Sequence, residues 1–179
     1  MAKSKSYMAS YRAAKGSASP SVKHAVIPSV RNPETPLKGT PKQVAWAQDI
    51  RDNLVSSINA YAVAQTAQGM EMQEKGGAFG ERAKDRLAAI PIVMGAMGDG
   101  VAKIDSAKVL IDNFSDYLGM SKIPTLSEMR ANKHDTRSAV MAMGDGVLNR
   151  LKRHGFVDSS IVSPGARNKA VRAMLDRMR

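Results

Sequence analysis

Three groups of basic residues contain the side chains of this chain that could do chemistry with a partner. The first group is interleaved with Tyr7 and Tyr11, and the second ends in a histidine. Lys and Arg neutralise phosphate groups, and tyrosine rings can stack on bases, so the groups indicate contact with nucleic acid. They consist of Lys3, Lys5, Arg12, Lys15 and Lys23; of Arg150, Lys152, Arg153 and His154; and of Arg167, Lys169, Arg172, Arg177 and Arg179.

The positive charge is concentrated at the two ends of the chain. Residues 1–40 hold seven Lys or Arg and one acidic residue, and residues 163–179 hold five and one. The 122 residues between them hold fifteen and fourteen, so the end segments carry almost all of the net charge of +11. Nucleic acid is the natural partner of such ends, and an acidic protein surface is the alternative. Because no zinc-finger, RRM or KH pattern is present, we expect contacts to phosphates rather than reading of the base sequence.

Residues that could support catalysis are few. None of the three histidines, His24, His134 and His154, belongs to an HExxH, HxH or nucleophile–base pattern. Carboxylates recur at helical spacing, as in Asp112 and Asp116. Such a pair can bind a divalent cation or act as acid and base, but it is more often a solvated helix face. The sequence therefore predicts a non-enzymatic protein with no metal site and no cofactor.

The composition favours helices. Aromatic residues make up 4% of the 179 residues, there are 12 methionines, and cysteine is absent, which excludes disulfides and thiolate metal sites. No apolar stretch reaches the roughly 18 residues of a membrane-spanning helix, and the N-terminus lacks the apolar segment of a secretory signal. We predict an all-α protein with a helical domain over residues 40–162. A basic, flexible and extended arm over residues 1–39 and a basic C-terminal helix over residues 163–179 flank it.

Capping and breaking residues predict where the helices begin and end. Thr40, Pro41 and Gln43 have the pattern of a capped helix start, and Thr125 with Glu128 repeats the capping box. The other boundaries follow from Gly, Pro and Asp. We expect the first helix to end near residues 68–69 and a second helix, over residues 80–90, to end or kink at Pro91. A third helix should run from Asp105 to Gly119, and a fourth from Thr125 through Met143. A short basic helix over residues 147–154 and a last helix that starts at residues 163–164 should follow.

A six-residue segment occurs twice. The sequence AMGDGV fills residues 96–101 and again residues 142–147. One interpretation is a reused corner between two helices, in which the glycines adopt positive φ and the aspartate caps the next helix. The other is a pair of loops that present N–H groups to phosphates. Neither copy has the Walker pattern or the acidic ligands of a calcium loop.

Two further motifs occur in a fixed order. Residues 42–51 read KQVAWAQDIR, and residues 106–113 read SAKVLIDN. Together they resemble a small module of uncharacterised phage, plasmid and bacterial proteins, which pairs a K-Q-x-x-W-A-x-x-I-R helix with a later S-A-K-aromatic-aromatic-I-D-N-R helix. Val109, Leu110 and Phe114 depart from the later motif. The resemblance covers less than a fifth of the chain and implies a phage, mobile-element or bacterial setting, with no known activity.

The same two motifs suggest a polar seam between their helices. A seam of this kind could bind a ligand or hold the two helices in register. Trp46, the only tryptophan, is expected to pack between them. The seam would comprise Lys42, Arg51, Lys108, Asp112 and Asn113.

The sequence as a whole predicts an accessory protein that associates with nucleic acid through phosphates, in the cytoplasm of a bacterial or phage-infected cell. The alternative is a protein-interaction component. It would be a virion or assembly subunit, or an inhibitor of a host complex, that docks through residues 1–39.

Overall fold

The chain folds into helices joined by short segments, as predicted. The computed structural model describes residues 27–117, 122–132 and 135–178. Within these ranges there is no strand, and the only β pairing is an isolated bridge between Lys38 and Ser106. Every helix in the described ranges is too short or too polar to cross a membrane. The helices are α2 (Pro41–Lys75), α3 (Gly77–Ala102), α4 (Ala107–Phe114), α5 (Leu126–Ala131), α6 (Thr136–Arg153) and α7 (Asn168–Arg177).

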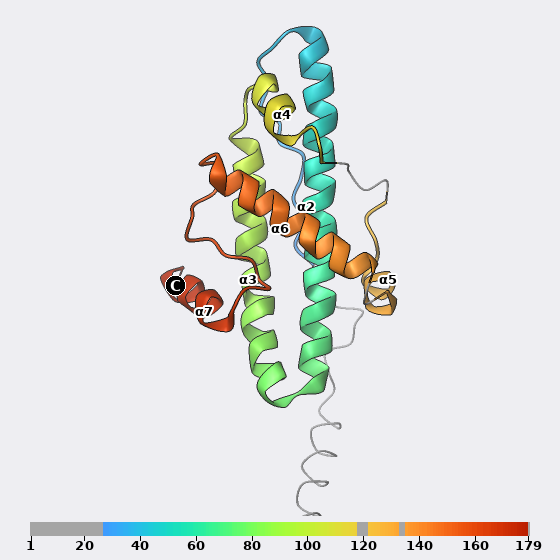
Figure 1. Cartoon of the computed structure of the whole chain (residues 1–179), viewed down its shortest axis with the longest axis vertical. Helices are drawn as coiled ribbons and strands as arrows, with labels where there is room; N and C mark the ends of the chain where they lie inside the picture. Colours follow the sequence, from blue (N-terminus) through green and yellow to red (C-terminus); the bar gives the residue numbers. More distant parts are fainter. Residues whose placement is uncertain (1–26, 118–121, 133–134, 179) are drawn as a thin grey trace, which may run out of the picture.

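Two long antiparallel helices, α2 and α3, form the body of the molecule (Figure 1). They are joined at Gly76 and Gly77, whose φ angles are 67° and 55°. Glycine adopts this left-handed region without the steric penalty that a Cβ brings, so the chain can reverse within two residues. Gly76 is therefore the one residue between the two helices.

Helix α2 begins as predicted but is longer than predicted. Both halves of the Thr40–Gln43 capping box form, with Pro41 in the first turn. The predicted end near residues 68–69 is wrong, because Gly69 is a buried residue inside the helix. A Cβ at Gly69 would lie 2.6 Å from a methyl carbon of Leu87 on α3. The glycine allows close approach of the two helices; it does not end α2.

The sequence predicted that the helix ends or kinks at Pro91, and the end is wrong because α3 continues through this residue. Pro91 is exposed, whereas Ile90, Val93 and Met94 around it are buried against the core. Proline removes one backbone hydrogen bond from a helix interior. Packing of the apolar residues on both sides of Pro91 outweighs that loss.

Both copies of the repeated hexapeptide lie inside helices, at the end of α3 and in the middle of α6. Neither interpretation drawn from the sequence is correct, since a continuous helix provides neither a corner nor a free row of N–H groups. Their glycines instead admit close neighbours. A Cβ at Gly144 would lie 2.1 Å from the ring of Tyr61, and one at Gly100 would lie 2.7 Å from Val157.

The remaining boundaries were predicted in part. The Thr125–Glu128 capping box forms, but α5 ends at Ala131, and a separate helix, α6, runs without a break to Arg153. The residue at the N-cap position of α4 is Ser106, not Asp105, and its side chain makes no capping bond; α7 begins at Asn168, several residues after the predicted start. Gly119 lies outside the described residues.

Helix α2 forms the centre of the core. All residues from 60 to 67 are buried, so the helix is enclosed on every side over two turns. Figure 1 shows α6 crossing α2 and α3, with α4 and α5 against α2 and α7 against α3. A helix that is buried all round is typical of a protein core and has no clear amphipathic pattern.

Residues 27–39 pack on the body, so the predicted flexible arm is too long. The segment runs antiparallel to α2: Val30 exchanges hydrogen bonds with the side chain of Asn59, at 2.7 and 2.9 Å. Further along, the N–H of Lys38 donates to Asp105 O, and the N–H of Ala107 donates to Lys38 O. Residues 1–26 lie outside the described residues.

Acid is expected to weaken the start of α5 through Glu128. Its carboxylate accepts from the N–H of Thr125 at 2.6 Å and from Lys122 at 3.1 Å. These bonds lower the pKa of Glu128 from 4.5 to about 2. A carboxylate whose pKa is lowered by folding stabilises the folded state at pH values above its ordinary pKa. This contribution is lost as the pH falls from 4.5 towards 2. Melting temperatures measured from pH 6 to pH 2 should therefore fall less in Glu128→Gln than in the parent; identical profiles would contradict this.

Candidate nucleic-acid interface

Two of the predicted cations at the end of α6, Arg150 and Lys152, are bonded to other groups of the same chain. The guanidinium of Arg150 donates to Asn113 O and pairs with Asp116, and it lies 4.7 Å from the centre of the Tyr117 ring. This pairing lowers the pKa of Asp116 and raises that of Arg150. Lys152 donates to Ile161 O at 2.8 Å. Arg150 and Lys152 thus fasten the end of α6 to neighbouring segments.

Arg153 and His154 are exposed beside this pair. They border a shallow hollow of about 500 Å³, together with Arg150 and the two aspartates of α4 and its end, Asp112 and Asp116. Positive and negative side chains alternate there, so the hollow has no strong preference for an anion. Lys152 and Arg153 have no ion pair in the described part of the chain, and Arg153 also lacks a carbonyl bond like the one that holds Lys152.

The cations of α7 divide in the same way. Arg172 pairs with Asp85 of α3 at 2.6 Å, and Arg177 donates to Ser160 O at 3.1 Å. Arg167 and Lys169 are exposed, and no ion pair of theirs occurs within the described ranges. Arg179 lies outside these ranges. Arg167, Lys169, Arg172 and Arg177 are exposed, as contact with a polyanion requires, but the pairing of Arg172 with Asp85 could not be foreseen from the sequence.

Helix α7 also brings Arg167 next to two arginines that the sequence analysis missed. Arg82 and Arg86 of α3 border the same hollow as Arg167, a space of about 300 Å³ that we term the arginine hollow. Its other lining residues are apolar or amide side chains and glycine, and none is acidic. Arg82 and Arg86 are four residues apart, which places them on one side of a helix. Their spacing could have indicated from the sequence that the two arginines share one side of a helix. Nothing in the sequence indicated that they meet Arg167, some 80 positions away.

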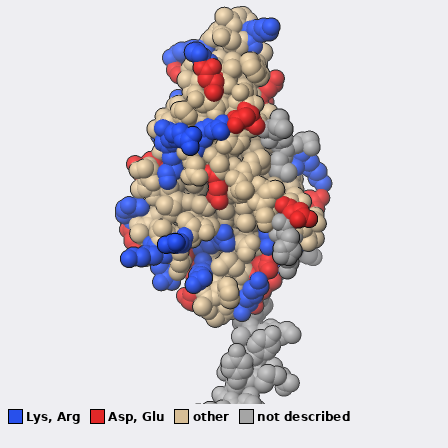
Figure 2. All heavy atoms as spheres, in the orientation of Figure 1, with Lys and Arg blue, Asp and Glu red and all other residues tan. Residues whose placement is uncertain are grey.

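Cationic side chains gather on the face of the molecule shown in Figure 2. Lys and Arg cover α7 and the adjoining part of α3, and a second group lies at the end of α6. Acidic side chains are interspersed among both groups. The basic residues from Lys3 to Lys23, which the sequence analysis grouped together, lie outside the described residues.

A buried polar cluster fixes the segment that leads into α7. The Tyr61 hydroxyl donates to Asp145 Oδ1 at 2.5 Å and lies 3.0 Å from Ser163 Oγ. Burial raises the pKa of Tyr61, and the nearby Asp145 raises it further. Ser163 in turn accepts from the N–H of Gly165. These bonds hold the segment 163–167, and so Arg167, against α2 and α6.

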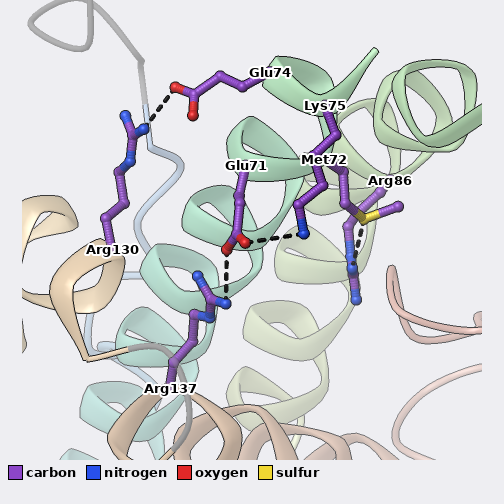
Figure 3. A network of polar contacts seen from close by, with 7 residues as sticks. All are labelled: Glu71, Met72, Glu74, Lys75, Arg86, Arg130 and Arg137. Atoms are coloured by element: carbon purple, nitrogen blue, oxygen red, sulfur yellow. Dashed lines mark hydrogen bonds and ion pairs between the residues drawn. The ribbon is translucent and has the colours of Figure 1, made fainter. Parts of the chain in front are cut away.

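Two acidic side chains near this region, Glu71 and Glu74, already have cationic partners. Figure 3 shows Glu71 of α2 between Arg137 and Lys75, at 2.9 and 3.1 Å, and Glu74 paired with Arg130 at 2.6 Å. None of these pairs includes an arginine of the hollow. The positive charge of Arg82, Arg86 and Arg167 is therefore not neutralised by an ion pair in the described part of the chain.

The predicted polar seam does not form. Lys108 pairs with Asp112 on the exposed side of its own helix, at 2.6 Å, and the Asn113 side chain donates to Val109 O. Lys42 is exposed, whereas Arg51 is buried at 1% exposure. Helix α2 turns Arg51 inward because it shares a face with Ala47 and Leu54.

Trp46 does not pack between the helices either, since its side chain is 53% exposed. It precedes the buried stripe of Ala47, Ile50 and Leu54 by one residue, which rotates it about 100° away from the core. The prediction of a core position rested on Trp46 lying one helical turn before Ile50, but the buried stripe at that level runs through Ala47.

Among the described residues, no three His, Asp or Glu side chains gather in a way that could hold a metal ion. Comparisons of the chain with protein-family models, curated proteins and solved structures gave no match.

Proposed function

We propose that this protein is a non-enzymatic accessory protein that associates with nucleic acid mainly through phosphate contacts. The single observation that carries the proposal is an excess of cations that the fold leaves without internal partners. The net charge is +11, and Arg153, Arg167 and Lys169 are exposed without an ion pair in the described ranges. Unpaired surface cations stay available to phosphates, and no folding change is needed to present them.

The proposed contacts come from three sources. The exposed cations of α6 and α7 offer a fixed surface, and the exposed Arg172 can join them by exchanging its partner Asp85 for a phosphate. Arg150 and Lys152 contribute mainly by positioning, since each is bonded within the chain. The cations from Lys3 to Lys23 add five charges that are proposed to reach the same polyanion. The proposed setting is a bacterial or phage-infected cell.

Salt dependence tests this proposal. Binding of the full chain to a fluorescent 20-base-pair duplex is measured by anisotropy at several salt concentrations. If six or more phosphates are contacted, affinity should fall by about 10³-fold or more between 50 and 200 mM salt. Undetectable binding at low salt, or an affinity that does not change with salt, would contradict the proposal.

The second candidate is a protein-interaction component, favoured by the exposure of Trp46. Large aromatic side chains are enriched in protein interfaces. A deletion of residues 1–26 separates the candidates and retains the segment from residue 27 that bonds to α2. Weaker nucleic-acid binding would support the first candidate. Loss of a stoichiometric protein complex with unchanged nucleic-acid affinity would favour the second.

A further inference from the structure

Arg86 is a largely buried cation whose bonded partners are neutral. Its Nε donates to Gln65 Oε1 at 2.9 Å, and its Nη1 donates to Met72 Sδ at 3.3 Å. The carboxylates of Glu71 and Glu74 lie in the same region but are paired with other cations, as Figure 3 shows. Burial lowers the pKa of Arg86, and the nearby Tyr61 and Asp145, neither of which is bonded to it, offset this effect only in part. A desolvated guanidinium without an anion is costly, and an anion beside it relieves that cost.

The arginine hollow gives an anion access to this side chain. Arg86 lines it, and its Nη2 lies against Gly165 on the opposite wall, where a Cβ would come within 2.6 Å. Arg82 and Arg167 border the same space and are exposed. Three guanidinium groups thus surround about 300 Å³ with no acidic side chain in the lining.

The start of α7 adds to the positive potential of the hollow. Asn168, the first residue of α7, lines it, and the first N–H groups of a helix have no partner within the helix. The helix dipole also favours negative charge at this end. No side chain caps α7.

We propose that the arginine hollow binds a terminal phosphate group, of the kind carried by a nucleotide or by the 5′ end of a nucleic-acid strand. A monoester phosphate has three terminal oxygens and nearly two negative charges, which suits three guanidinium groups that each offer paired donors. A recessed Arg86 is reached more easily by a terminal phosphate that projects than by one inside a strand. This site shares Arg167 with the open surface proposed above, whereas Arg82, Arg86 and Gly165 belong to the hollow alone.

Calorimetric titration of the full chain with inorganic phosphate, pyrophosphate and AMP, at fixed ionic strength, tests the site. Arg82→Gln/Arg167→Gln removes two exposed charges, and Gly165→Ala keeps every charge but displaces Arg86 Nη2. Each variant should bind these ligands at least tenfold more weakly than the parent. Lys103→Gln, the control, removes an exposed cation at the end of α3 that does not line the hollow and should bind within twofold of the parent. Equal losses in the control and the test variants would overturn the proposal, as would no phosphate binding by the parent.

Oligonucleotides distinguish the two sources of the phosphate and separate this site from the proposed function. If a strand end is the ligand, a 5′-phosphorylated 12-mer should bind at least threefold more tightly than its 5′-hydroxyl form, and Gly165→Ala should remove the difference. If both forms bind equally while AMP binding depends on the hollow, the ligand is a nucleotide. Salt-dependent binding of both oligonucleotides without any phosphate, pyrophosphate or AMP binding would sink the site and leave the proposed function standing.

Discussion

Replacing Gly144 with alanine should lower the free energy of unfolding by about 2 kcal/mol. The added Cβ would lie 2.1 Å from the Tyr61 ring, far inside the contact distance of two carbon atoms. The ring is completely buried, and its hydroxyl is held by Asp145 and Ser163, so it cannot move aside. Overpacking of this kind costs about 1–3 kcal/mol. We place the cost near the upper value and subtract about 1 kcal/mol for the better helix propensity of alanine.

Gly95→Ala provides the matched control. Gly95 also lies inside a helix, but it is exposed and has no atom within 4 Å of an added Cβ. Only the helix-propensity gain remains, so Gly95→Ala should stabilise the protein by up to about 1 kcal/mol. Urea unfolding of both variants measures the contrast. Equal free energies of unfolding would show that α6 does not cross Tyr61 as described.

Replacing Arg51 with methionine should lower the free energy of unfolding by about 2 kcal/mol. Its guanidinium donates to Thr35 O at 2.7 Å and to Ile104 O at 2.8 Å. Burial lowers the pKa of Arg51, and its Nε has no partner in the described part of the chain, so the residue is not an ideal core group. Removing it nevertheless leaves two carbonyls without their donor, at about 1–3 kcal/mol each. Methionine avoids the cost of keeping a charged guanidinium out of water, and this gain offsets part of the loss.

The effect should be local as well as global. Arg51 joins α2 to the segment before it and to the residues before α4, so the amides of Lys38 and Ala107 should exchange faster in Arg51→Met. Lys42→Met, an exposed change on the same helix, should alter stability by less than about 0.5 kcal/mol. Unchanged exchange and unchanged stability in Arg51→Met would contradict the role given to this side chain.

The helical class and the capped helix starts could be predicted because they depend on neighbouring residues. Thr40 with Gln43, and Thr125 with Glu128, specify their turns through bonds three residues apart. Gly69, Pro91 and Gly144 were misread because their effect depends on a distant partner. Gly69 packs against Leu87, and Gly144 packs against Tyr61. Only the fold brings each glycine close to its partner.

The candidate site also combines features that could be predicted from the sequence with features that only the fold creates. Exposed cations such as Arg153 and Lys169 could be found from charge alone. The hollow could not, because Arg86 reads as one charge in a mixed segment until burial and Gly165 define its surroundings. Arg51 was expected at a polar seam, yet its place on the buried stripe of α2 assigns it to carbonyls in the core.

The salt dependence of nucleic-acid binding, compared between two triple variants, tests the central claim most directly. Arg153→Gln/Arg167→Gln/Lys169→Gln removes three unpaired cations of the proposed face. Lys42→Gln/Lys103→Gln/Lys108→Gln removes the same charge from the end where α2 begins and α3 finishes. For duplex DNA each lost phosphate contact reduces the slope of log affinity against log salt by about 0.9. The account predicts a slope shallower by about 2 to 3 in the first variant and nearly unchanged in the second; equal slopes in the two variants would contradict it.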